Sequence, residues 1–242
     1  FDETIEKSFS LGENLARETN TKFVLMIDEF PSIMDLKKNG EKAGEGAIRK
    51  LRTIREKQTH SSLCIAGSIR STMDAVALSS QSAFYKQLTA RQVKPLEEEF
   101  VKQLLEKNLG RKITSGGAKK VFELCGGIPF YAHLLGKKLQ LLGEIDGKAV
   151  EKAFSSMLLD EGTIIFKEEF DSLSPKEKRI IVEMGKKGWT GITQAAAHTK
   201  DNPSNVLTVL RHLEEKGVVE KKEKGEYVLV DKVFKQWIKT TY

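Results

Sequence analysis

The stretch FVLMIDE, residues 23–29, places two acids directly after five consecutive apolar residues. Apolar runs of this length are typical of strands in parallel sheets, whose two faces are both covered by helices. Ligands of α/β folds bind at the carboxyl ends of such strands. The stretch therefore predicts a buried parallel strand that presents Asp28 and Glu29 at the functional edge of a sheet.

The residues on either side of this stretch alternate between helical patterns and apolar runs. We expect a helix at 2–18, a Gly-rich loop at 40–46, a basic helix at 47–57, a second buried strand at 63–67 and a candidate third strand at 90–94. Strand and helix in alternation are typical of a parallel α/β sheet. The second strand is followed by Ser68, which is therefore predicted to lie beside the two acids.

The two acids suit nucleotide hydrolysis. Asp28 would hold Mg²⁺ through water, because Mg²⁺ combines a few carboxylates with phosphate oxygens. Glu29 would orient and polarise the attacking water, and Ser68 would lie beside the γ-phosphate. A strand that simply ends in two solvated acids remains an alternative at this point.

The character of the chain changes after Pro95, where a helical pattern begins. Breaks are expected at 110, 115–117 and 126–129, and further helices at 147–159 and 161–172. Ser174, Pro175 and Glu177 then form the capping-box signature of a new helix start. We therefore predict an α/β part at 1–95, an all-helical part at 96–173 and a C-terminal part at 174–242.

The C-terminal part has the order helix, helix, turn, helix and hairpin of a winged helix-turn-helix. The helices are expected at 174–185, 192–198 and 205–216, and the strands of the hairpin at 218–222 and 226–230. This part holds 14 Lys and Arg against 9 Asp and Glu, which is +5 of the chain's net charge of +6. Such a charge favours an anionic partner.

A winged helix that binds duplex DNA inserts its third helix into the major groove, N-terminal residues first. The side chains expected to face outward for such contacts are Ser204, Asn205, Thr208, Arg211 and His212 on the third helix and Lys221, Lys222 and Lys224 on the wing. Winged helices also dock proteins or hold a neighbouring domain closed, and Glu214 and Glu215 suit that alternative. Double-stranded DNA and a protein both remain candidate partners.

Four motifs stand in a fixed order along the chain. They are LMIDEFPSI from residue 25, LCIAGSIRSTM from 63, FYKQLTARQVKPL from 84 and CGGIPFYAHLL from 125, and the predicted winged helix follows them. In this order they resemble the archaeal ATPase family, which is grouped with AAA+-related signal-transducing NTPases and is similar in layout to archaeal origin-recognition ATPases. The resemblance covers nearly the whole chain. It implies a partial P-loop NTPase core with a parallel sheet, a helical lid, and ATP with Mg²⁺ as ligands.

The resemblance also assigns roles to individual residues. It implies that Asp28 and Glu29 are the Walker B acids and that Ser68 occupies the sensor 1 position, with Arg70 nearby. The turn at 126–129, which contains Gly127 and Pro129, resembles the lid motif whose proline packs against adenine. A plain corner between two helices is the alternative for that turn.

Two features depart from the family's pattern. No G-x-x-x-x-G-K-[ST] motif occurs in the 242 residues, and the family carries this phosphate-binding loop upstream of the Walker B acids. The chain begins at Phe1 rather than Met, so we expect a cut end and weak ATP binding by these residues alone. The family often has an arginine after the second strand, and Arg91 aligns with it only loosely.

Composition narrows the environment of the protein. No run of 18 apolar residues occurs, so no membrane span is expected, and a cytoplasmic protein is predicted. Cys64 and Cys125 are expected to be buried free thiols of a reducing compartment. His133 is interpreted as a packed lid residue, and Trp237 as part of the apolar face of a final helix.

Three functions remain open from the sequence. The first is an ATP-driven switch that uses its winged helix on DNA. The second is a signalling NTPase whose winged helix is a protein-docking or autoinhibitory module. The third is a binding unit without enzymatic activity, because the phosphate-binding loop is absent.

Overall fold

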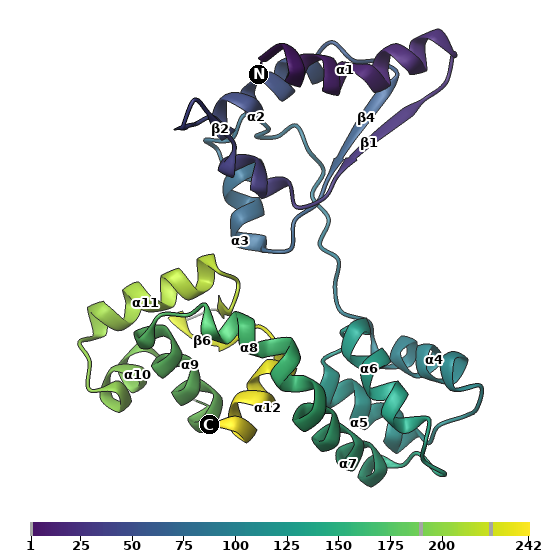
Figure 1. The fold of residues 1–242 in the computed structure, drawn as a ribbon, viewed down its shortest axis with the longest axis vertical. Helices are drawn as coiled ribbons and strands as arrows, with labels where there is room; N and C mark the ends of the chain where they lie inside the picture. The colour runs from purple at the N-terminus through teal and green to yellow at the C-terminus, as the bar shows by residue number, and fades with distance from the viewer. Residues whose placement is uncertain (1, 189–190, 223–224) are drawn as a thin grey trace. The chain divides into compact units, whose positions relative to one another are not determined.

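A computed structural model describes residues 2–188, 191–222 and 225–242 (Figure 1). Lys224, predicted to contact DNA, lies outside these residues, and the side chain of Arg70 is likewise not described. The chain divides into two compact units, Phe1–Arg91 and Gln92–Tyr242. Each unit is described by itself.

The first unit contains the predicted pair of parallel strands. Strand β1 (Phe23–Ile27) pairs with β4 (Ser61–Ile65) in parallel, with Phe23 opposite Ser61 and Ile27 opposite Ile65. Helix α1 (Asp2–Glu18) precedes the pair, and α2 (Gly44–Arg55) connects the two strands. The 3-10 helix η1 (Phe30–Asp35) follows the acids, and α3 (Arg70–Met73) and the π-helix η2 (Asp74–Leu78) follow β4.

The prediction that both strands are buried is wrong. Ile27, Leu63 and Ile65 pack toward the core, but Met26 is 74% exposed and Cys64 is also exposed. The alternating exposure shows that the described helices cover one face of the sheet and leave the other bare. The predicted burial of the Cys64 thiol is therefore also wrong.

Two further local predictions are corrected. Residues 90–94 form no strand in the described chain, and Val93 is 96% exposed, because no ladder partner lies beside it. The loop expected at 40–46 begins as a hairpin of β2 (Lys37–Lys38) and β3 (Glu41–Lys42). Asn39 and Gly40, with φ of 54° and 86°, supply the two left-handed residues that a tight hairpin turn requires.

A buried carboxylate fixes α1 to the start of β4. Glu13 accepts hydrogen bonds from the backbone N–H groups of Thr59 (3.0 Å) and His60 (3.0 Å). Burial alone would raise the pKa of Glu13, but these bonds and one from Ser61 outweigh it and hold the pKa far below its usual range. The ionised carboxylate is thus the form that the fold requires.

We expect Glu13→Gln to destabilise the first unit near neutral pH, because an amide NH₂ group would face the N–H donors of Thr59 and His60. A carboxylate with a lowered pKa stabilises the fold above its unfolded pKa, near 4.5, and loses this effect as pH falls through the folded pKa. The difference in melting temperature between wild type and variant should therefore shrink from pH 7 to pH 3. Glu18→Gln, an exposed position on the same helix, is the matched control.

The second unit is helical apart from one hairpin. Its elements are α4 (Glu98–Leu109), α5 (Ser115–Cys125), α6 (Pro129–Leu139), α7 (Gly147–Met157), the π-helix η3 (Leu158–Gly162), α8 (Thr163–Asp171), α9 (Pro175–Lys187), α10 (Ile192–Thr199), α11 (Pro203–Glu215), β5 (Val219–Lys221), β6 (Tyr227–Leu229) and α12 (Lys232–Thr241). The break expected at 115–117 is wrong. Thr114 caps α5 by accepting from the N–H of Gly117 (3.0 Å), so these residues form the first turn of the helix.

The C-terminal elements occur in the predicted order. Ser174 and Glu177 form the capping box that begins α9, and β5 pairs with β6 in an antiparallel hairpin. The assignment of these elements as a winged helix stays a prediction. So does the domain boundary at Leu173, which is itself buried in the core of this unit.

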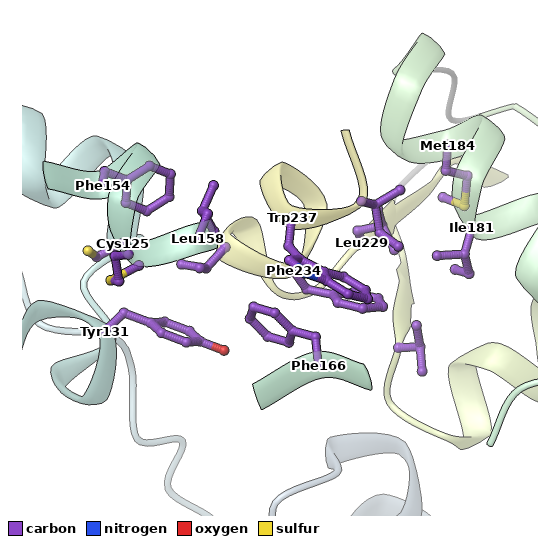
Figure 2. Close-up of a cluster of buried hydrophobic side chains, with 14 of the residues drawn as sticks. Cys125, Tyr131, Phe154, Leu158, Phe166, Ile181, Met184, Leu229, Phe234 and Trp237 are labelled. Carbon is purple, nitrogen blue, oxygen red and sulfur yellow. The ribbon is translucent and has the colours of Figure 1, made fainter. Parts of the chain in front are cut away.

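One hydrophobic core runs through the second unit from Val101 to Ile238 (Figure 2). Figure 2 shows the part that extends from Cys125 past Phe166 and Trp237 to Met184. Cys125 is buried as predicted, and burial raises the pKa of its thiol to about 12. Trp237 is also buried, in agreement with its predicted place on the apolar face of the last helix. No helix in the described chain is long and apolar enough to cross a membrane.

Candidate functional site

The turn that carries the two acids is bonded to the end of the neighbouring strand. The N–H of Ala66 donates to the carbonyl of Ile27 (2.9 Å), and the N–H of Phe30 donates to the carbonyl of Ala66 (2.8 Å). Asp28 and Glu29 lie between these two bonds in the sequence, and Ser68 follows Ala66 by two residues. The structure therefore brings the three residues to the same end of the two-stranded sheet.

The acids are exposed because the next residue anchors the turn. Phe30 is buried and packs edge-on against Phe84, with ring centroids 6.0 Å apart. Glu29 has the left-handed backbone angles φ 46° and ψ 44°, which cost a residue with a side chain about 1–2 kcal/mol. The N–H of Glu29 donates to Oδ1 of Asp28 (2.9 Å), and the N–H of Ser32 donates to the Glu29 carbonyl (2.9 Å). These bonds hold the acids in a defined turn at the surface.

The donor set suits a magnesium ion that arrives with a nucleotide. Asp28 is exposed, and its Oδ2 atom is not used in the Asp28–Glu29 turn. Within the described residues, no three His, Cys, Asp or Glu side chains are arranged to hold a metal ion. Mg²⁺ prefers one or two carboxylates together with phosphate oxygens and water. An ion at Asp28 would thus take its other ligands from phosphates and water.

A close packing contact explains the glycine before Ser68. A Cβ atom at Gly67 would lie 2.6 Å from Cγ of Met73 and 2.9 Å from Cδ of Pro31. A larger residue would push η1 away from the end of β4, and the acid turn would move with η1. Gly67 thus keeps Ser68 and the acid turn together, and Ser68 is exposed.

The predicted adenine-contacting residues belong to the second unit. Gly126 and Gly127 have φ of 64° and 76°, and they end α5 before α6 begins at Pro129. Pro129 is exposed, and so are its apolar neighbours Ile128 and Phe130. An exposed apolar surface at the start of a helix fits the flat face of a base. The side chain of His133 is exposed and forms a hydrogen bond with Asn108 (3.1 Å between Nδ1 and Nδ2). The prediction that His133 is packed in the lid is therefore wrong.

The described side chains predicted to contact DNA are all exposed. They are Ser204, Asn205, Thr208, Arg211 and His212 on α11 and Lys221 and Lys222 on the hairpin. Several are already engaged: Thr208 donates to the Ser204 carbonyl (3.1 Å), and Lys222 pairs with Glu220 (2.7 Å). In the described chain, Asn205, Arg211 and Lys221 make no side-chain hydrogen bond or ion pair, which leaves them available to a ligand.

A cavity of about 310 Å³ lies beside β4. It is lined by Arg52, Arg55, Glu56, Ser62, Leu63, Phe84, Gln87 and Leu88. Arg52 donates to the Ala83 carbonyl (2.6 Å), and Arg55 donates to the Ser61 carbonyl (2.9 Å). Both guanidinium groups therefore already bond to the protein, and the carboxylate of Glu56 lines the same cavity.

A known structure shares this fold. Over 96% of its length the chain superimposes on 67% of a Walker-type ATPase from Pyrococcus abyssi, with a TM-score of 0.75 and 17% sequence identity. The RuvB Holliday junction branch migration motor of Thermotoga maritima is matched over 97% of this chain and 93% of that chain, with a TM-score of 0.37 and 13% identity. No protein-family model and no curated protein matches the chain. At 17% identity the likeness to the Pyrococcus abyssi protein concerns the fold alone, and the chain shares the fold of that Walker-type ATPase.

Proposed function

We propose that residues 1–91 carry the acidic half of a Mg²⁺-dependent ATPase site and that residues 92–242 carry its lid. The observation that supports this most is the joint placement of Asp28, Glu29 and Ser68 at the carboxyl end of two parallel strands. In this assignment Asp28 binds Mg²⁺ through water, Glu29 orients the attacking water, and Ser68 contacts the γ-phosphate. Gly127 and Pro129 form the lid turn that packs against adenine.

The proposed reaction needs a phosphate-binding loop that the 242 residues do not contain. Backbone N–H groups of such a loop hold the β- and γ-phosphates, and its lysine neutralises their charge. The acids described above act on the metal and the water but offer no positive charge to the phosphates. The proposal therefore concerns a protein that carries these residues together with a G-x-x-x-x-G-K-[ST] segment.

We expect Asp28→Asn to weaken binding of ATP with Mg²⁺ in a form of the protein that contains such a loop. Loss of one carboxylate that holds the metal through water should reduce the affinity by about 10-fold. Affinity for ATP in EDTA should stay the same, because no metal is then present for Asp28 to hold. Calorimetric titrations with Mg²⁺ and with EDTA measure both, and an equal loss in the two conditions would contradict the metal assignment.

The 242-residue chain without the loop is expected to bind ATP only weakly. Micromolar affinity in a calorimetric titration of this chain alone would show that phosphate binding does not depend on a loop outside it. The 242 residues would then contain a nucleotide site other than the one proposed here, even if the chain is a binding unit without enzymatic activity.

A second candidate function is binding of double-stranded DNA by the C-terminal elements. Asn205, Arg211 and Lys221 on α11 and β5 favour it, because they are exposed and unpaired among the described residues. The excess positive charge of residues 174–242 also favours it. Arg211 and Asn205 would contact base edges or phosphates, and Lys221 and Lys222 would contact phosphates. Protein docking by the same surface is the alternative.

We expect weak duplex DNA binding whose log–log dependence on salt has a slope of roughly −3 to −5, because each phosphate contact releases counterions. Replacing Lys221 and Lys222 by alanine should flatten the slope by about 2 and weaken all sequences alike. The exposed lysines Lys107 and Lys119 of the helical lid, replaced by alanine, are the control for net charge. A fluorescence titration at low and physiological salt measures the slope, and no binding at low salt would favour protein docking.

A further inference from the structure

The lid turn is held between two other segments of the second unit. On one side the N–H of Leu96 donates to the Gly127 carbonyl (2.9 Å), and a Cβ atom at Gly127 would lie 2.2 Å from the Leu96 carbonyl oxygen. On the other side a Cβ atom at Gly126 would lie 3.2 Å from Cδ of Lys232, the first residue of α12. A shift of this turn toward Leu96 must therefore displace the backbone there, whereas Lys232 meets the turn only with its flexible side chain.

A hydrogen bond between side chains 100 residues apart joins α6, which follows the lid turn, to the start of α12. The hydroxyl of Tyr131, two residues after Pro129, donates to Oδ2 of Asp231. The other oxygen of Asp231 caps α12 by accepting from the N–H groups of Val233 (2.7 Å) and Phe234 (3.0 Å). One carboxylate thus serves both the lid helix and the last helix. Burial, and then the bond to Asp231, raises the pKa of Tyr131, so its hydroxyl keeps its proton and remains the donor.

Aromatic packing also connects α6 with α12, through Phe166 of α8. The ring of Phe166 lies 6.0 Å from that of Tyr131 and 5.7 Å from that of Trp237, measured between centroids (Figure 2). Helix α12 also packs closely against α9, because a Cβ atom at Gly185 of α9 would lie 2.6 Å from Cγ2 of Ile238. Close-packed contacts of this kind transmit displacement, because few voids are available to absorb it.

The connection reaches α11 through a second shared carboxylate. Glu177 of α9 accepts from the Ser174 N–H (2.7 Å) and from Nζ of Lys216 at the end of α11 (2.9 Å). The lid turn, α12, α9 and α11 are therefore linked by named contacts. The outer face of α11, with Asn205 and Arg211, stays exposed.

From these contacts we infer that Tyr131 and Asp231 form a joint that couples the lid turn to the C-terminal helices. A nucleotide held at Pro129 and an anionic partner held on α11 would then influence each other's binding, and the influence would be reciprocal. This regulatory role rests on the proposed nucleotide site. The joint itself is a property of the 242-residue chain and is tested without a nucleotide.

Hydrogen exchange of the 242-residue chain, followed by mass spectrometry, tests the joint. Tyr131→Phe removes one hydroxyl, and a hydrogen bond to a charged partner that is lost this way should raise exchange about 10-fold at α12 and at α6 together. Asp231→Ser keeps an N-cap for α12 but has no second oxygen for Tyr131. If the two groups act as a pair, the double variant should exchange no faster at α6 than either single variant.

Two results would overturn the joint: faster exchange at α6 with no change at α12, or fully additive effects in the double variant. Tyr85→Phe, an exposed tyrosine of the first unit, is the control for loss of a hydroxyl. In a form that contains a phosphate-binding loop, ATP with Mg²⁺ should change exchange at α12 in the wild type and not in Tyr131→Phe. Equal changes in both would overturn the regulatory role, whereas failure of ATP to bind at all would count against the proposed nucleotide site and leave the joint to be judged from the first experiment.

Discussion

Glu29→Gln is expected to abolish nearly all ATP turnover in a form of the protein that contains a phosphate-binding loop, while ATP remains bound. Glutamine has the shape of glutamate but does not accept a proton from the attacking water. Loss of a positioned general base lowers rates by about 10²- to 10⁴-fold. Phosphate release under saturating ATP measures turnover, and a parallel calorimetric titration measures binding.

ATP binding should survive the loss of turnover, because the substitution leaves the backbone of the Glu29 turn unchanged. The backbone of Glu29 is fixed by the bonds to Asp28 and Ser32, and the substitution leaves those backbone groups in place. Glu41→Gln, an exposed glutamate of the β2–β3 hairpin, is the matched control and should turn over ATP at the wild-type rate. Wild-type turnover by Glu29→Gln would show that the strand ends in two solvated acids without a catalytic role.

Patterns that involve neighbouring residues were predictable from the sequence. The apolar runs located β1 and β4, and the signature of Ser174 and Glu177 located the start of α9. In each case the residues that indicate the strand or helix lie within it or directly beside it in the sequence. The Asn39-Gly40 pair was an equally local signal for the β2–β3 hairpin, but the glycines that follow it favoured a loop instead.

Features that depend on distant residues were not predictable. An apolar run predicts a strand, but its burial depends on what covers the sheet, and the described helices leave Met26 and Cys64 bare. Tyr131 and Asp231 are 100 residues apart, and neither stands in a motif that indicates the other. For the candidate site, the residues were found from the strand ends, whereas the left-handed turn at Glu29 had no signal, since glutamate rarely adopts it.

Phe166→Ala is expected to cost about 3–5 kcal/mol of the free energy of unfolding, because it removes a large buried ring and leaves a cavity. The ring lies between Tyr131 of α6 and both Phe234 and Trp237 of α12, so the loss falls on one core and not on a single helix. Urea unfolding followed by circular dichroism measures the change.

The shape of that unfolding curve distinguishes one shared core from two independent ones. If the lid helices and the C-terminal helices unfold together, Phe166→Ala moves the transition of the whole second unit to lower urea without changing its slope. Ile164→Ala, on the same helix but with a side chain 77% exposed, should leave the curve within about 0.5 kcal/mol of wild type. Two separate transitions, with only the one for residues 96–173 displaced, would instead place an energetic boundary at Leu173, because Phe166 lies on the N-terminal side of that residue.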